Sequence, residues 1–405
     1  MANIITPAAG NDARLDALRL IQGLTSLNAD ELQAVRTILD PVTDRTRRTY
    51  GDLELVPWRV KRERFRAGSL ATLRIGCVGD SKTMGAGAGT GSQLTDGAAA
   101  KNRSTKMAAR ASQMSGLNFR TDSFYGAHGL ASFDPAVRAW DPKLTNMTVS
   151  AGGFSLGGGT MNVNSGNVTY QPGAPWNTAK IAIRDVTGDG VLNVNKGAEN
   201  QTIPITNTGV KEVTLTFARG TEPIILTKSS GNAVPVIGAT LYDTTVPSID
   251  VVNFGAYGVQ SLSFADSTTS AVSPLLAIPQ IKCDLWFLNL GSNDLLIPVA
   301  AADYGTRMGS IVDAMLTSGP VILKAPLLPD YTATIPTREA LHSAYTEQLL
   351  AVAASRQNVL LLFDSGPFGG RANAVAQGAL NADLLHETEM AYAMQALMDA
   401  GVILR

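Results

Sequence analysis

The sequence predicts an α/β protein whose parallel sheet is interrupted by a β-sandwich. In the second half of the chain, strand-like apolar runs alternate with helical runs, which indicates a parallel sheet with helices on both faces. Between about 145 and 245, helical periodicity disappears and short β-rich segments follow one another closely. We therefore expect one discontinuous α/β domain, residues 46–144 and 246–405, around an inserted sandwich, residues 145–245.

The elements of the α/β domain can be placed from their apolar patterns. The expected strands are 73–78, 249–254, 283–290, 321–325 and 359–363, and the expected helices are 302–316, 338–356 and 387–400. The strand 73–78 ends at Gly79-Asp80-Ser81, which small residues follow.

Residues 1–45 are expected to form a helical arm that precedes the α/β domain. Apolar residues recur at helical spacing from Leu15 to Leu24 and again from Leu32 to Leu39, and Pro41 ends the second run. The stretch 44–66 is rich in Lys and Arg. Because acidic residues are interspersed, we interpret it as a solvated connector and not as a polyanion-binding strip.

The predicted sandwich is rich in Thr and Asn and poor in charge. Its expected strands are 163–170, 180–184, 191–194, 201–205, 212–217, 223–227 and 234–241. One turn, from Asp185 to Asn193, resembles the start of a calcium loop. The twelfth position of such a loop needs a bidentate acid, but here it is Lys196. We expect a β-hairpin turn at Asp189-Gly190 instead, and no metal site.

Composition and charge argue against several classes of protein. The net charge of −1 provides no general attraction to nucleic acid or to an anionic membrane. No apolar run approaches the roughly 18 residues that span a bilayer, so membrane insertion is not expected. The first ten residues do not resemble a secretory signal, which indicates synthesis in the cytoplasm or release with a virion by lysis.

The two cysteines, Cys77 and Cys283, both lie in apolar strand-like runs. Two thiols form neither a disulfide framework nor a zinc site, so buried free thiols are expected, with a bridge between neighbouring strands as the alternative. Nothing in the sequence indicates a cofactor.

Four turns carry the candidate chemistry, because the carboxyl ends of parallel strands meet at one edge of a sheet. Ser81 follows the first strand, Gly258 the second and Asn293 the third, while Asp383 and His386 precede the last helix. The spacing of the last pair lets the carboxylate orient the imidazole from within one turn. The competing interpretation of Ser81 and Asp383 is that each belongs to the cap of a helix.

Together these turns resemble the four blocks of the SGNH, or GDSL-type, hydrolase superfamily. The resemblance implies a three-layer, flavodoxin-like parallel sheet. It also implies a catalytic triad of Ser81, Asp383 and His386, and an oxyanion hole formed by the backbone N–H groups of Ser81 and Gly258 and the side chain of Asn293.

Two features depart from the family pattern. Lys82 stands where Gly-Asp-Ser-Leu has leucine. A second stretch, Ser123 to Gly129, also resembles the second block, so Gly129 competes with Gly258 for the oxyanion role; this stretch includes His128, which could line a cleft. The inserted sandwich, expected to be jelly-roll-like, resembles the carbohydrate-binding insertion of phage- and prophage-encoded members.

The resemblance implies a serine esterase without cofactor or metal. We expect it to remove O-acetyl groups from a bacterial surface polysaccharide, as a phage tail-associated protein. The alternatives are a general carboxylesterase or lipase, and a non-catalytic receptor-binding module on an esterase scaffold. A homo-oligomer formed through the N-terminal arm stays open.

Gly153-Phe154-Ser155-Leu156-Gly157 also matches the Gly-x-Ser-x-Gly motif. That motif needs a helix directly after the serine, and here a β-rich segment follows. We therefore do not expect Ser155 to be a nucleophile.

Overall fold

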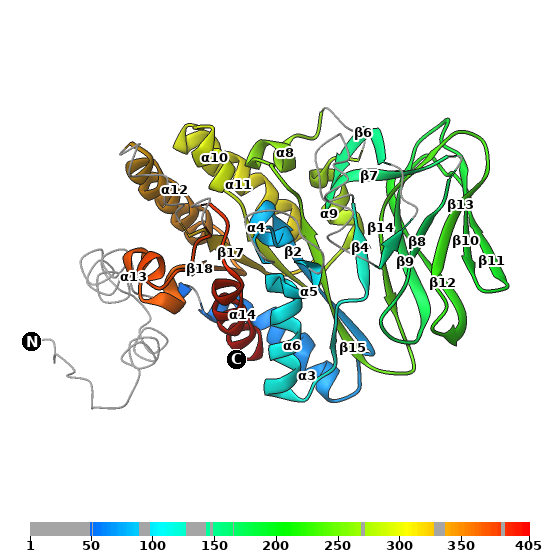
Figure 1. Ribbon diagram of the computed structural model, residues 1–405, viewed down its shortest axis with the longest axis horizontal. Helices are drawn as coiled ribbons and strands as arrows, with labels where there is room; N and C mark the ends of the chain where they lie inside the picture. The colour runs from blue at the N-terminus through cyan, green and yellow to red at the C-terminus, as the bar shows by residue number, and fades with distance from the viewer. Residues whose placement is uncertain are drawn as a thin grey trace, which may run out of the picture. The chain divides into compact units, whose positions relative to one another are not determined.

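The computed structural model describes most of the chain after the predicted N-terminal arm (Figure 1). The described residues are 49–50, 52–88, 98–126, 143–145, 149–164, 166–268, 272–327, 337–381 and 385–405. The expected arm, residues 1–45, lies outside them. No helix in these ranges combines the length and apolar character needed to cross a membrane.

A seven-stranded sheet forms the centre of the α/β part. Its strands are β1 (Thr49–Tyr50), β2 (Thr72–Gly79), β3 (Phe119–Arg120), β15 (Ser248–Gly255), β16 (Leu285–Asn289), β17 (Val321–Ala325) and β18 (Val359–Phe363). The order is β1-β18-β17-β16-β2-β15-β3, and all pairs are parallel except β1 with β18. The chain builds outward from β2 in both directions, so β2 ends at the place where open α/β sheets bind ligands.

The helices of the described residues have these bounds: α3 (Val56–Arg66), α4 (Ser81–Met84), α5 (Ala98–Lys101), α6 (Arg103–Ser115), α8 (Ser261–Ala265), α9 (Pro274–Ile281), α10 (Ser292–Leu296), α11 (Ala301–Leu316), α12 (Thr337–Ala354), α13 (Arg371–Ala376) and α14 (Glu389–Leu404). Short 3-10 turns lie at Asp52–Leu55 and Gly366–Phe368.

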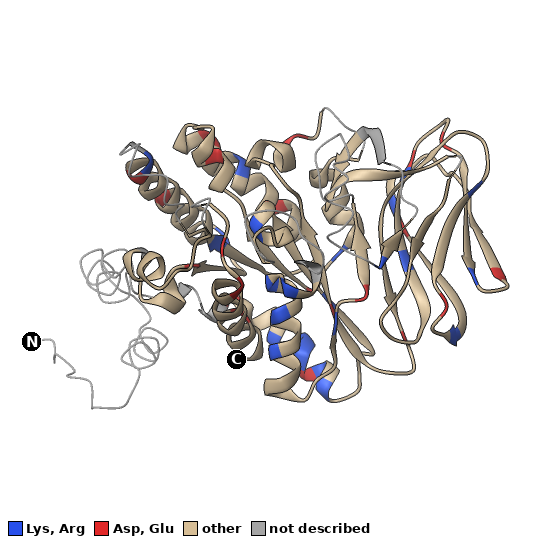
Figure 2. Cartoon of the chain, viewed as in Figure 1, with Lys and Arg blue, Asp and Glu red and all other residues tan. Residues whose placement is uncertain are grey.

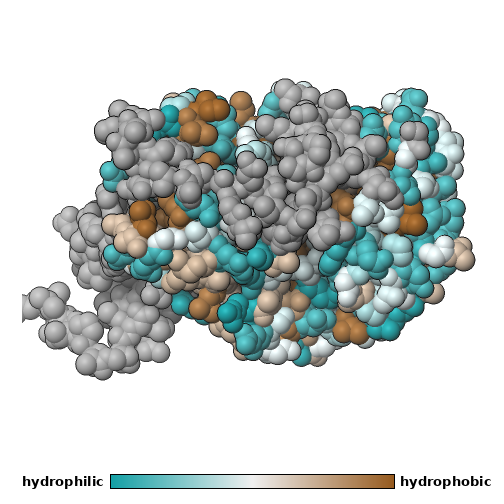
Figure 3. Space-filling model, in the orientation of Figure 1, coloured by the Kyte–Doolittle hydropathy of each residue, from teal (hydrophilic) through white to brown (hydrophobic). Residues whose placement is uncertain are grey.

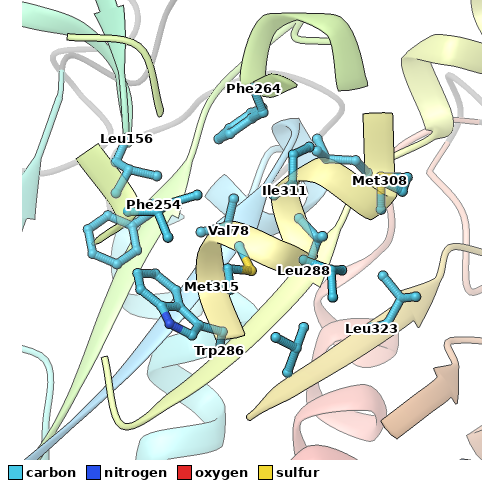
Figure 4. Packing of buried hydrophobic residues seen from close by; sticks show 14 of the residues in the cluster. Val78, Leu156, Phe254, Phe264, Trp286, Leu288, Met308, Ile311, Met315 and Leu323 are labelled. Carbon is cyan, nitrogen blue, oxygen red and sulfur yellow. The ribbon is translucent and has the colours of Figure 1, made fainter. Parts of the chain in front are cut away.

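The sheet is buried on both faces, because alternate residues of its strands enter different apolar cores. One core joins the sheet to α11 and α12 and includes Val78, Trp286, Leu288, Met308, Ile311, Met315 and Leu323 (Figure 4). The other joins it to α3, α6 and α14 and includes Trp58, Ile75, Met107, Phe287, Leu360 and Ile403. The chain therefore forms the three layers that the sequence predicted.

Helix α3 corrects one prediction. Residues 56–66 were expected to be part of a solvated connector, which is wrong for this segment. Trp58 and Phe65 bury against the sheet, and Arg62 is 5% exposed and donates to the carbonyl of Ile403 at 2.9 Å. Two aromatic residues seven positions apart make an apolar stripe, which the basic residues along the same helix obscure (Figure 2).

Two antiparallel sheets form the sandwich. Its strands are β4 (Ser123–Tyr125), β5 (Leu144–Thr145), β6 (Val149–Ser155), β7 (Gly158–Val163), β8 (Val168–Tyr170), β9 (Trp176–Asp185), β10 (Val191–Lys196), β11 (Glu199–Ile203), β12 (Gly209–Gly220), β13 (Ile224–Ser230) and β14 (Val234–Tyr242). One sheet has the order β11-β10-β13-β8-β5 and the other β12-β9-β14-β7-β6, with β4 on β14. Apolar residues of both sheets, such as Ile181 and Leu226, share one core.

The sandwich begins and ends beside the central sheet. The first strand that pairs with its sheets is β4, upstream of residue 145, and β14 leads directly to β15. Asn118, before β3, accepts the N–H of Ile249 at 2.8 Å and donates its side chain to the carbonyl of Pro247, 129 positions away. A buried ion pair, Arg74 with Glu212 at 2.6 Å, joins β2 to β12.

Two details of the sandwich differ from expectation. The strand expected at 163–170 is two strands, because β7 ends at Val163 and β8 begins at Val168, with Gly166 between them. The turn at Asp189-Gly190 is no hairpin, since β9 and β10 belong to different sheets. Pairing partners depend on distant strands, which the turn sequence does not encode.

The acids of the supposed calcium loop have protein partners. Asp189 pairs with Arg184 at 2.6 Å. Asp185 accepts hydrogen bonds from the hydroxyls of Thr206 and Thr208, and these bonds lower its pKa against the opposing effect of its burial.

Candidate active site

The segment after β2 presents Ser81 at the carboxyl edge of the sheet. Asp80 caps the short helix α4, because its side chain accepts the N–H of Lys82 at 2.9 Å. Ser81 is the first residue of that helix. Gly255, at the end of β15, lets the backbone of α4 pack directly against this strand, since a Cβ at Gly255 would collide with the backbone of Met84.

His386 lies against Ser81, although the two are 305 positions apart. Its Nε2 is 3.0 Å from the serine Oγ, and the two residues are 4% and 3% exposed. This is the distance over which a general base activates a hydroxyl nucleophile. Asp383, the predicted third member, lies outside the described residues, and its role stays a prediction.

The other two predicted oxyanion residues, Gly258 and Asn293, follow the strands on either side of β2, which are β15 and β16. Asn293, in α10, donates its side-chain amide to the carbonyl of Val259 at 2.8 Å, and an amide nitrogen has a second hydrogen to give. Gly258 precedes Val259 and has a φ of 73°, the left-handed region that glycine favours. The N–H of Ser81, at the start of a helix, has no intrahelical acceptor. Gly129 and His128 lie outside the described residues.

Two further residues support the site through hydrogen bonds that shape its turns, the role expected of Asp294 from the sequence. Asn253 of β15 donates to the carbonyls of Thr83 and Met84 at 3.0 and 3.3 Å, which ties the serine turn to the next strand. Asp294 accepts the N–H and the hydroxyl of Ser261, the latter at 2.6 Å. These contacts join loops far apart in sequence, and the only available signal was that polar residues cluster after strands.

Tyr257 is a further residue without a predicted role. Its ring stacks on that of His386, with centroids 6.2 Å apart and planes 18° from parallel. The residue is 45% exposed. Tyr257 therefore connects the buried imidazole with the surface of the protein.

Burial shapes the electrostatics beneath the serine. It raises the pKa of the Asp80 carboxyl to about 7, although nearby Lys82 acts in the opposite direction. Burial likewise raises the pKa of Asp294, against the hydrogen bonds from Ser261. Within the described ranges, no group of His, Cys, Asp and Glu could hold a metal ion.

The remaining histidine, serine and cysteine candidates have the following surroundings. His342, in α12, contacts the carbonyl of Pro326 at 3.1 Å. Ser155 is fully buried in the β6–β7 turn, with no helix after it, as expected. Cys77 and Cys283 are buried free thiols, as predicted, and burial raises the pKa of Cys77 to about 12.

Comparison with solved structures identifies the fold. A structure described as a peptidoglycan O-acetylesterase in action has a TM-score of 0.64 and 16% identity, over 87% of this chain and 97% of that one. A family 2 carbohydrate esterase with its carbohydrate-binding domain, from Corynascus thermopiles, has a TM-score of 0.30 and 15% identity, over 60% and 95% of the two chains. A lipolytic G-D-S-L protein from Veillonella parvula has a TM-score of 0.32 and 18% identity, over 40% and 84%.

At TM-scores under 0.5, the last two add no argument. No sequence profile of a protein family matches the chain, and no curated protein sequence matches it either. The assignment therefore depends on the first structure, whose alignment extends over most of both chains. The chain has the α/β fold of the SGNH, or GDSL-type, hydrolases, with additional antiparallel sheets consistent with an inserted domain.

Proposed function

We propose that this protein is a serine esterase that removes O-acetyl groups from a bacterial surface polysaccharide. One observation carries the proposal: the Ser81 Oγ lies 3.0 Å from the His386 Nε2, at the carboxyl end of β2 in an SGNH-type sheet. A hydroxyl and an imidazole in this geometry are the reacting pair of acyl transfer.

In the first step, His386 takes the proton of Ser81 while the serine oxygen attacks the ester carbonyl. The resulting oxyanion is held by the N–H groups of Ser81 and Gly258 and by the Asn293 amide. His386 then passes the proton to the sugar oxygen as its bond to the acyl carbon breaks, so the sugar leaves as a hydroxyl and the acetyl group remains on the serine. In the second step, His386 deprotonates a water that attacks the acetyl-enzyme, which releases acetate and restores the hydroxyl. Asp383 is assigned the orientation of the imidazole.

The preference for a glycan ester is supported by two observations. The structural neighbour with the long alignment is itself described as a peptidoglycan O-acetylesterase. In addition, the described surface over the antiparallel strands is largely hydrophilic on the face in Figure 3, which suits contact with a hydrated polymer. Acetylated peptidoglycan is therefore the first polysaccharide to test.

Acetate release tests the proposal. The protein and its Ser81→Ala variant are incubated with O-acetylated peptidoglycan, with other O-acetylated bacterial polysaccharides and with an aryl acetate. We expect acetate from a polysaccharide with the native serine and none with Ser81→Ala. Ser155→Ala is the matched control, because it removes a buried hydroxyl from the other serine motif and should keep full activity.

The rival functions give different results. Hydrolysis of the aryl acetate without action on any polysaccharide supports a general carboxylesterase. Binding to a polysaccharide without acetate from any ester supports a receptor-binding module. Full activity of Ser81→Ala contradicts the assigned nucleophile.

A further inference from the structure

Lys82 and Glu387 form a buried ion pair directly beside the two reacting residues. The lysine Nζ lies 3.4 Å from the glutamate Oε1, and each side chain is 1% exposed. Lys82 follows Ser81 in sequence, and Glu387 follows His386. The same Nζ donates to the carbonyl of Leu327, just beyond β17, at 2.8 Å. One ammonium group thus joins the turn that carries Ser81, the segment after β17 and the segment that carries His386.

Further contacts join the segment that follows Ser81, up to Gly87, to the segment around His386. Asn381 donates its side-chain amide to the carbonyl of Gly87 at 3.1 Å, and the hydroxyl of Tyr392 donates to the carbonyl of Ala86 at 2.8 Å. A Cβ at Gly87 would lie 2.9 Å from the Cβ of His386. The backbone of the serine turn is therefore packed directly against the segment that carries the histidine.

A contribution to stability is a poor explanation for this ion pair. Removing two charges from water costs about as much as their attraction returns, and apolar replacements of similar size are often neutral or stabilising. Leucine, which Gly-Asp-Ser-Leu has at the position of Lys82, could fill the space without that cost. What an ion pair adds over apolar packing is an attraction between two particular groups.

We propose that the Lys82–Glu387 pair positions Ser81 against His386. Neither residue touches the substrate in this proposal, so both are positioning residues, and the inference rests on the proposed esterase function. If the pair is removed, the two segments keep the Asn381 and Tyr392 contacts but lose the attraction between the residues next to Ser81 and His386, so these two can shift relative to each other. A displacement of about 1 Å in a reacting group can lower a rate by about 10²-fold.

The decisive variant replaces both members, Lys82→Leu with Glu387→Gln, so that no charge is left unpaired in the interior. Each single replacement is made as well. The matched control is the Arg74–Glu212 pair, at 2.6 Å with side chains 5% and 12% exposed, which lies near the start of β2, the opposite end of the strand from Ser81. Its double variant is Arg74→Met with Glu212→Gln.

For each variant we would measure kcat and KM with an aryl acetate, the midpoint of unfolding and the crystal structure. The single Lys82 and Glu387 variants should unfold earlier, and the double variant should regain much of that loss. Its kcat should still fall by about 10- to 100-fold, with KM nearly unchanged. Its Ser81 Oγ to His386 Nε2 separation should exceed about 3.5 Å, beyond hydrogen-bond range. The control double variant should keep its kcat and its Ser81–His386 contact whatever its stability.

A double variant that recovers stability and also retains the 3.0 Å contact and the native kcat overturns the proposal. The proposal is also overturned if the Lys82/Glu387 and Arg74/Glu212 double variants lose kcat equally, because an equal loss would reflect general destabilisation. The crystal structures test the positioning role separately from the proposed esterase function. If the native protein hydrolyses no ester but the contact is lost in the double variant, the proposed function fails and the positioning role stands.

Discussion

The ring of Tyr257 stacks on the ring of His386, nearly parallel, at a centroid distance of 6.2 Å. In the proposed mechanism, His386 becomes a cation each time it takes the serine proton. An aromatic face stabilises a neighbouring cation by about 0.5–1 kcal/mol at an exposed site. Tyr257→Ala should therefore lower kcat/KM by about two- to fivefold, and Tyr257→Phe, which keeps the ring, should not. An equal loss in both variants would assign the effect to the hydroxyl and contradict the stacking argument.

Asn293 offers a test of the oxyanion hole. Its amide already donates to the carbonyl of Val259, so the side chain is held in place before substrate arrives. Removal of one such donor costs about 10²–10³ in kcat. We expect Asn293→Ala to lose activity by that factor on aryl acetate with little change in KM. A loss below about threefold would mean that Asn293 supplies no oxyanion contact and only links the loops.

Asp80 predicts a pH dependence of stability. Its pKa is raised to about 7 in the folded protein because the carboxyl is buried, whereas the unfolded value is near 3.8. The folded state thus favours the protonated form, and the stability present at acidic pH is lost as the pH rises from about 4 to about 7. An asparagine at position 80 would still cap α4 with its side-chain oxygen, but it carries no titrating carboxyl group.

Denaturant unfolding of the native protein and of Asp80→Asn checks this prediction. The free energy of unfolding of Asp80→Asn, relative to that of the native protein, should increase as the pH rises from about 4 to about 7. Above that range the difference between the two proteins should be constant. A difference that is independent of pH between 4 and 8 would show that Asp80 titrates normally.

Gly87 should be intolerant of a side chain for two reasons. Its φ of 84° lies in the left-handed region, which costs an L-residue about 1–2 kcal/mol. A Cβ would also collide with Asn381 and press on His386. Gly116→Ala is the matched control, since Gly116 has a φ of 70° but open space around it.

Chemical denaturation should show a larger loss of stability for Gly87→Ala than for Gly116→Ala. The loss of kcat should be confined to Gly87→Ala. Equal losses of stability in the two variants would mean that the histidine segment yields to the added methyl group.

Five of the seven strands of the central sheet were predictable because their apolar runs are local, whereas the two-residue strands β1 and β3 were not predicted. The expected bounds of β17 and β18, 321–325 and 359–363, match the structure, and β2 differs by one residue at each end. These strands are buried on both faces, so each appears as a continuous apolar run between turns. Helix α3 was missed because burial of its two aromatic residues depends on what the helix packs against.

The same distinction, between signals that are local in the sequence and contacts that depend on distant residues, applies to the candidate site. Ser81, Asn293 and His386 could be singled out because each follows or precedes a recognisable element, and the structure brings Ser81 and His386 into contact. Glu387, Asn253 and Tyr257 matter through partners far away in sequence, and nothing local distinguishes a Glu beside a His from any other surface Glu. Lys82 was visible only as a departure from Gly-Asp-Ser-Leu.

The hydrogen bonds of Asn118 bring together the two points where the chain leaves and re-enters the central sheet. For the central sheet, the antiparallel strands are then an insertion between two points that these bonds hold together, which fixes the register of β3 against β15. The insertion is not separate from the sheet, because Leu156 and Ile237 of the inserted segment share an apolar core with Phe254 and Trp286. A substitution in that shared core is therefore felt on both sides of the connection, in the insertion and in the strands β15 and β16 that lead to the candidate site.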